Sequence, residues 1–111
     1  MDLSITVTEN GASRTVRLEG TCDLATAPDL RNALQPLLPP DVQEVVVDVS
    51  ALEFIDSTGL GVILGAMRRL REGRGTLRIA GATGSVRRVL EITDLDKVIP
   101  LVDAEPDGLG V

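Results

Sequence analysis

The stretch DSTGLG, residues 56–61, stands between a β-branched run, VVVDV at residues 45–49, and an apolar segment over residues 58–71. A nearly continuous β-branched run is typical of a strand with neighbours on both sides. The apolar residues of the following segment recur at helical spacing: Leu60, Ile63, Leu64, Met67 and Leu70. The sequence therefore predicts that the chain passes from a strand into a helix at residues 56–61.

This junction places two hydroxyls, Ser57 and Thr58, at the start of a helix. A helix start has unpaired backbone N–H groups and a partial positive charge. A phosphate attached there would be tolerated and would add about −1.5 to −2 of charge to the surface. We interpret the junction as a switch. A simpler interpretation stays open, in which Ser57 or Thr58 is a helix N-cap and the glycines allow close packing. The segment lacks the spacing of a P-loop or a dinucleotide-binding fingerprint.

The N-terminal half predicts a hairpin and a helix. Residues 3–8 and 15–19 alternate apolar and polar side chains around the turn signal Asn10-Gly11. A helix follows, with Thr26 and Asp29 in a capping-box arrangement at its start. Its apolar face extends to residue 37, before Pro39 and Pro40 end it.

The C-terminal half predicts a strand at residues 76–80, a helix at 85–92 and a short edge strand at 97–101. Residues 103–111 are expected to be a frayed tail. The order is then β-β-α-β-α-β-α-β, in which the later strands pair in parallel. We expect one domain over residues 1–111, of α/β (α+β layered) class, with a mixed four- to five-stranded sheet and helices mainly on one face.

The composition argues against catalysis and against several partners. The chain has 111 residues, no histidine, one cysteine and a single aromatic residue, Phe54. The chain therefore lacks the residues for a nucleophile–histidine pair or for the usual zinc sites. It also lacks the aromatic side chains on which nucleic-acid bases stack. The net charge of −6 argues against nucleic acid. We expect a protein that is not an enzyme and has no cofactor or metal.

The sequence has no apolar run of the roughly 20 residues that a membrane span requires, and its first residues show no signal-peptide pattern. We therefore expect a cytoplasmic protein without direct membrane insertion. Cys22 has no disulfide partner and is expected to be a small packed side chain.

Charge is unevenly distributed along the sequence. Residues 1–60 contain ten acids and three arginines, whereas residues 68–88 contain seven arginines and one acid, Glu72. The ordinary explanation is a solvated helix face plus a turn. The alternative is a contact for an acidic partner or an anionic ligand.

Taken together, these motifs resemble the STAS domain of bacterial anti-sigma factor antagonists. That family has Asp-Ser-(Ser/Thr)-Gly-Leu-Gly after its central strand, as residues 56–61 do here. Residues 20–27 fall at the family's Gly-Glu-x-Asp turn, although Thr21 stands where Glu is usual. Residues 81–86 match the turn into the third helix, so the resemblance covers residues 3–102.

The resemblance implies a partner-switching function. In the family, an anti-sigma factor with serine kinase activity phosphorylates the serine that follows the aspartate, which is Ser57 here; Thr58 is the second choice. The unphosphorylated antagonist binds the anti-sigma factor and releases the sigma factor. Phosphorylation abolishes binding, and a PP2C-type phosphatase restores it.

The resemblance also implies a partner-binding surface formed by Asp23, Asp56, Ser57, Thr58, Gly59, Leu60 and Gly61. Asp56 either orients the Ser57 hydroxyl or binds nearby backbone N–H groups, and Asp23 has the simpler role of a turn residue as its alternative. Phe54 and Ile55 are expected in the core. Other functions stay open for the chain: a STAS subunit of a lipid or anion transport system, a stress-signalling scaffold, and weak nucleotide binding.

Overall fold

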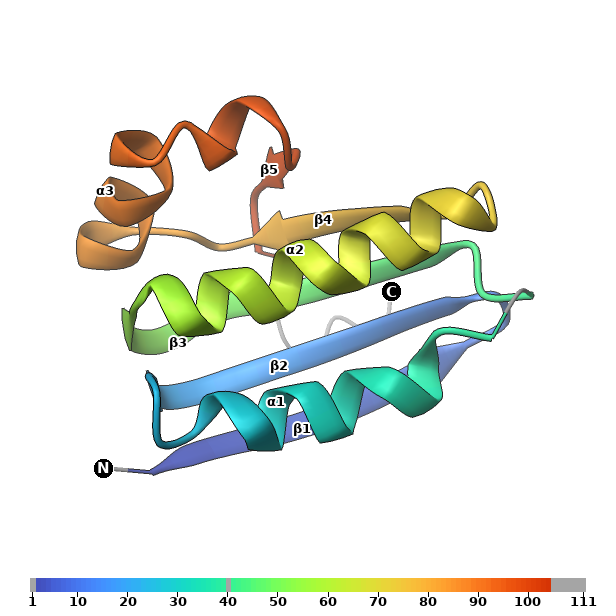
Figure 1. Ribbon diagram of the computed structural model, residues 1–111, viewed down its shortest axis with the longest axis horizontal. Helices are drawn as coiled ribbons and strands as arrows, with labels where there is room; N and C mark the ends of the chain where they lie inside the picture. The colour runs from blue at the N-terminus through green and yellow to red at the C-terminus, as the bar shows by residue number, and fades with distance from the viewer. Residues whose placement is uncertain (1, 40, 105–111) are drawn as a thin grey trace.

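The computed structural model describes residues 2–39 and 41–104, whose five strands form one sheet in the order β1-β2-β3-β4-β5 (Figure 1). The strands are β1 (Leu3–Asn10), β2 (Ser13–Cys22), β3 (Glu44–Ile55), β4 (Thr76–Ala80) and β5 (Leu101–Val102). The helices are α1 (Ala27–Leu34), α2 (Ser57–Glu72) and α3 (Gly84–Ile92), with short 3₁₀ helices η1 (Gln35–Leu37) and η2 (Leu95–Lys97).

The sheet is mixed, as predicted. β1 and β2 form an antiparallel hairpin in which Asn10 pairs with Ser13. Gly11 takes φ +61° at the turn, a conformation that glycine adopts without steric cost. The other neighbouring strands pair in parallel, which places the carboxyl ends of β2 and β3 at the same edge of the sheet.

Helices α1 and α2 lie side by side across one face of the sheet (Figure 1). The core fills the space between these helices and the central strands, and Val16, Leu18, Leu30, Val47 and Ile63 are each fully buried there. Burial of each such side chain is worth about 1.5–3 kcal/mol relative to exposure. The apolar residues predicted at helical spacing in α2 thus lie along one side of the helix that faces the core, as predicted.

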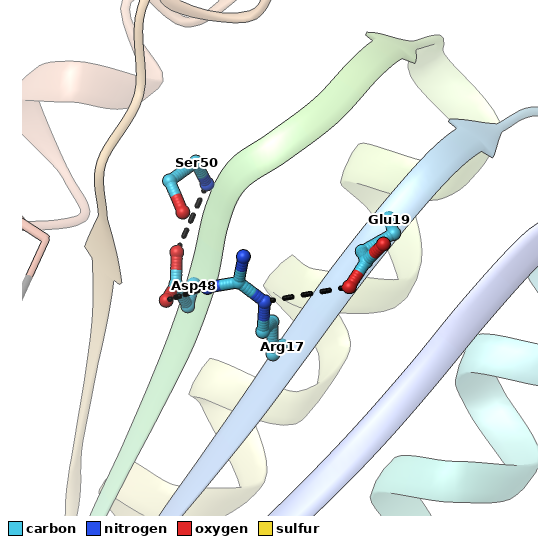
Figure 2. A network of polar contacts seen from close by, with 4 residues as sticks. All are labelled: Arg17, Glu19, Asp48 and Ser50. Atoms are coloured by element: carbon cyan, nitrogen blue, oxygen red, sulfur yellow. Dashed lines mark hydrogen bonds and ion pairs between the residues drawn. The ribbon is translucent and has the colours of Figure 1, made fainter. Parts of the chain in front are cut away.

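The opposite face of β2 and β3 has a polar network, shown in Figure 2. Arg17 Nη1 lies 3.3 Å from Asp48 Oδ2, and Arg17 Nε lies 3.5 Å from Glu19 Oε1. The backbone N–H of Ser50 donates to the other oxygen of Asp48 at 2.9 Å. Asp48 is only 8% exposed, so its charge depends on these partners.

The first helix differs from its prediction at both ends. It ends at Leu34 and continues as η1, because Pro36 has no N–H to donate to the preceding turn. Thr26 occupies the N-cap position, but its side chain makes no capping bond. Its hydroxyl instead donates to the carbonyl oxygen of Thr21 at 2.8 Å and accepts from the N–H of Asp23 at 2.9 Å.

Two further predictions are wrong. The strand expected at residues 97–101 is reduced to Leu101–Val102, since η2 takes up Leu95–Lys97 and Pro100 donates no ladder bond. Phe54 is 46% exposed, whereas its neighbour Ile55 is buried as expected. Successive strand residues point to opposite faces, and Phe54 points away from the covering helices. Most of the predicted tail, residues 105–111, lies outside the described residues.

Across residues 2–39 and 41–104, no helix is both long enough and apolar enough to cross a membrane. The same residues contain no group of acidic, cysteine or histidine side chains placed to hold a metal ion.

Candidate functional site

Ser57 is the first residue of α2, at the carboxyl end of β3. Its side chain is exposed, and its hydroxyl makes no hydrogen bond to any residue that the structure describes. Thr58, the second choice, is half-buried. The predicted strand-to-helix junction is therefore confirmed, and the serine is the more accessible of its two hydroxyls.

Asp56 is the N-cap of α2. Its Oδ1 accepts hydrogen bonds from the backbone N–H groups of Thr58 at 3.0 Å and Gly59 at 3.1 Å. A capping carboxylate satisfies donors that a helix start leaves unpaired and complements the helix dipole. The interpretation in which Ser57 or Thr58 provides the cap is thus wrong, and the one in which Asp56 binds backbone N–H groups is confirmed.

The second oxygen of Asp56 connects the junction to another loop. Asp56 Oδ2 accepts from the backbone N–H of Leu24 at 3.1 Å, and the N–H of Asp56 donates to the carbonyl oxygen of Cys22 at 3.1 Å. These bonds hold the start of α2 against the loop between β2 and α1. Both carboxylate oxygens of Asp56 are engaged by backbone amides, so they are not directed at the Ser57 hydroxyl.

Asp23 shapes that second loop. Its Oδ1 accepts from the N–H groups of Ala25 at 3.0 Å and Thr26 at 3.1 Å, which closes the turn into α1. The side chain is half-buried. Asp23 therefore has the simpler of its two expected roles, that of a turn residue. The loop that it shapes lies beside Ser57.

The glycines and the leucine of the motif have different positions. A Cβ on Gly59 would lie 2.6 Å from the Sγ of Cys22 and 3.0 Å from Cγ1 of Ile55, so only glycine fits there without a shift. Leu60 is 4% exposed and belongs to the core, so its side chain is not offered to a partner. Gly61 is exposed, and a Cβ added to it would meet nothing within 4 Å. Of the expected surface residues, Gly59 and Leu60 thus support the site from below.

Cys22 lies beneath the junction and is fully buried, as expected. Burial, and to a smaller extent the nearby carboxylates of Asp56 and Asp23, together raise the pKa of its thiol from 9.0 to about 11. The thiol therefore stays protonated at neutral pH. It packs as a small apolar group and has no thiolate character.

Two apolar side chains at this end of the sheet lie on the surface, which the sequence patterns did not predict. Leu24 is 74% exposed and Phe54 is 46% exposed. Leu24 follows Asp23 in the loop, and Phe54 pairs with Thr21 two residues before Asp56. The alternation of side chains along β3 could have revealed Phe54, whereas no local pattern distinguishes Leu24.

The seven arginines of residues 68–88 are exposed on α2, the loop after it, β4 and α3. Arg78 pairs with Glu44 at 3.4 Å and Arg87 with Glu91 at 3.5 Å. Arg71 donates to the carbonyl oxygen of Val98 at 3.4 Å. The arginines are therefore divided among several surfaces. For most of them this agrees with the explanation of a solvated helix face plus a turn.

The architecture is that of a small α/β domain in which a surface serine begins the helix after the central strand. A family model described as "Mlab, STAS domain" matches residues 5–103, nine-tenths of the sequence. The chain belongs to the STAS domain family, as its motifs indicated.

Named relatives and solved structures agree with this assignment. The chain is 30% identical to the anti-sigma-B factor antagonist of Listeria monocytogenes, over 99% of this chain and 97% of that protein. A crystal structure of an anti-sigma factor antagonist from Mycobacterium paratuberculosis is 29% identical, covers 91% of this chain and 86% of its own, and has a TM-score of 0.80. The Bacillus cell fate determinant SpoIIAA in its phosphorylated form shares the fold at 22% identity and a TM-score of 0.75, with 94% of each chain covered.

Proposed function

We propose that this chain is an anti-sigma factor antagonist that is switched at Ser57. The unphosphorylated form binds an anti-sigma factor with serine kinase activity and releases the sigma factor. Phosphorylation of Ser57 ends that binding, and a PP2C-type phosphatase restores it. The chain then acts as a binding module and as a substrate of both enzymes, without an activity of its own.

The observation that carries the proposal is the position of Ser57. Its hydroxyl is exposed and without a hydrogen-bond partner in the described part of the chain, while the backbone beneath it is fixed by Asp56. A kinase needs an accessible hydroxyl, and a binding surface needs a rigid support. Ser57 meets both requirements, whereas the half-buried Thr58 meets the first less well.

A phosphate on Ser57 would find little compensation within the chain. The first-turn N–H groups of Thr58 and Gly59 are already taken by Asp56, whose carboxylate would also repel the phosphate. The new charge would therefore remain at the surface, and a partner covering it would bury an unpaired dianion. Burial of an unpaired charge costs several kcal/mol, and about 4 kcal/mol weakens binding roughly a thousandfold. No rearrangement of the fold is required.

The relatives support the same function. The Listeria protein, which this chain matches over nearly its whole length, is named an anti-sigma-B factor antagonist. The SpoIIAA structure is of a phosphorylated form, so in that protein the fold accommodates a phosphate.

Phosphate transfer tests the proposal. The protein is incubated with Mg-ATP and each candidate anti-sigma kinase encoded in its own genome, and intact mass is followed for wild type, Ser57→Ala and Thr58→Ala. We expect one added phosphate in wild type and Thr58→Ala, and none in Ser57→Ala. Failure of every such kinase to modify the wild type would refute the proposal.

A second candidate function is that of a STAS subunit in a transport system. The matching family model is described as "Mlab, STAS domain", words that name the domain and no antagonist activity. Co-purification distinguishes the two functions: an antagonist retains a small ATP-dependent kinase, whereas a transport subunit retains components of a membrane transporter.

A further inference from the structure

A groove of about 230 Å³ runs between α1 and α2 on the outer side of the helical layer. Gly61 and Gly65 of α2 line it, and Arg31, Gln35 and Arg69 stand along its sides. Figure 1 shows the two helices beside each other over this length. The groove begins at Gly61, one helical turn from Ser57.

The glycines of the groove have no explanation within the fold. Neither Gly61 nor Gly65 has a positive φ, and a Cβ at either position would meet nothing within 4 Å. Gly59 is different, because Cys22 leaves no room for a side chain there. Glycine is among the least favourable residues inside a helix. Two glycines that nothing in the fold requires therefore keep the groove floor open for a close approach of another backbone.

The charge of the groove is opposite to that of the protein. The whole chain has a net charge of −6, yet the ionic groups that line the groove are the guanidinium groups of Arg31 and Arg69. Neither forms an ion pair or hydrogen bond with any residue in the described ranges, whereas Arg17 and Arg78 are paired with acids. Glu72 lies one turn beyond Arg69 and is outside the lining. Two unpaired cations beside an open floor are complementary to an acidic chain.

The groove is continuous with the switch. Ser57, Gly61 and Gly65 are spaced four residues apart and therefore lie along one side of α2. At 1.5 Å per residue, Ser57 is about 6 Å from Gly61 along the helix. That separation is shorter than the Debye length of about 8 Å at physiological salt. A charge on Ser57 is thus felt at the entrance to the groove.

We propose that the α1–α2 groove binds an acidic segment of the anti-sigma kinase. The segment's backbone rests on Gly61 and Gly65, and its carboxylates pair with Arg31 and Arg69. This inference rests on the function proposed above and adds a second part to the same interface. Phosphorylation of Ser57 then acts by repelling this acidic segment as well as by burying a charge.

Binding of the kinase that phosphorylates Ser57 tests the inference, measured by titration calorimetry at two salt concentrations. We expect Arg31→Glu/Arg69→Glu to bind at least a hundredfold more weakly and with less dependence on salt than wild type. Gly65→Gln, which fills the floor without changing charge, should weaken binding at least tenfold. Arg88→Glu, an exposed reversal on α3, is the matched control and should change binding less than threefold.

The outcomes separate the two proposals. Tight binding of wild type together with unchanged binding of both groove variants would overturn the groove inference and leave the antagonist function intact. Absence of any kinase that binds and modifies wild type would overturn both. Circular dichroism of each variant confirms that a loss of binding is not a loss of fold. Concentration-dependent dimerisation that groove variants abolish would assign the groove to a second copy of the chain and so overturn the inference.

Discussion

The carboxylate of Asp56 accepts a hydrogen bond from the backbone N–H of Leu24 at 3.1 Å, although the two residues are 32 positions apart in the chain. The same carboxylate caps α2 through Thr58 and Gly59. One side chain therefore sets the start of the helix that presents Ser57 and also the position of the neighbouring loop.

Substitution of Asp56 should separate these two roles. Asp56→Ala removes the cap, and we expect a loss of about 2 kcal/mol in the free energy of unfolding by urea. Asp56→Asn keeps an oxygen for the cap, but its second terminal atom is an N–H₂ donor that repels the Leu24 N–H. Its stability should remain within about 1 kcal/mol of wild type, while hydrogen exchange at the Leu24 amide accelerates.

Asp41→Asn, at an exposed loop position, is the matched control and should alter neither property. If the Leu24 amide exchanges equally fast in wild type and Asp56→Asn, the connection between the loops does not exist in solution.

This connection marks the limit of what sequence patterns predicted. The hairpin, α2 and the mixed sheet follow from local signals: alternation, the Asn10-Gly11 turn and the helical spacing from Leu60 to Leu70. The Asp56–Leu24 bond joins segments that meet only after β2 and β3 pair in parallel. No local pattern encodes that meeting.

The errors have the same physical origin. Phe54 was expected in the core, but the face of the sheet to which it points lacks a covering helix (Figure 1). Asp94 takes a left-handed conformation, with φ +60°, and precedes η2, whose last residue, Lys97, was expected to begin a strand. The type of a side chain predicts its burial only when it is known which face of the sheet the helices cover. Tertiary packing decides which face that is.

Gly59 and Gly65 should respond oppositely to substitution by alanine. Gly59→Ala places a Cβ 2.6 Å from Cys22 Sγ, so we expect a destabilisation of about 1–3 kcal/mol by overpacking. Gly65→Ala meets nothing within 4 Å and should stabilise the protein by about 0.5–1 kcal/mol through helix propensity. Thermal and urea unfolding of both variants measure the difference. Equal destabilisation by the two substitutions would show that close packing at Cys22 is not the reason for Gly59.

The polar network of Figure 2 should contribute more to the free energy of unfolding than an exposed ion pair on the same face of the sheet does. Arg17→Met leaves Asp48, which is 8% exposed, with a charge that has lost its cationic partner. We expect the free energy of unfolding, measured with urea, to fall by about 2 kcal/mol. Arg78→Met breaks the more exposed pair with Glu44 and should cost less than about 1 kcal/mol.

Adding Asp48→Asn to Arg17→Met removes the uncompensated charge and should recover part of the loss. A double variant less stable than Arg17→Met would contradict the assignment of the cost to Asp48.

The buried thiol of Cys22 should make stability depend on pH at the alkaline end. Its pKa in the folded protein is about 11, against 9.0 for an ordinary thiol, because burial and then the carboxylates of Asp56 and Asp23 disfavour the thiolate. Between these values the unfolded chain releases a proton that the folded chain retains. The stabilisation is therefore complete below pH 9 and is lost as pH rises to about 11. A shift of this size corresponds to at most about 3 kcal/mol.

Urea unfolding of wild type and Cys22→Ala from pH 8 to 11 measures this effect. The chain has no tyrosine and one lysine, Lys97, which is exposed, so few other side chains titrate in the same window. We expect the free energy of unfolding of wild type to fall with pH and that of Cys22→Ala to stay nearly level, whatever their difference at pH 8. Parallel pH profiles would mean that the thiol ionises equally easily in both states. The same burial should keep Cys22 unreactive toward thiol reagents in the native protein at pH 8, with labelling only as fast as the junction above it opens.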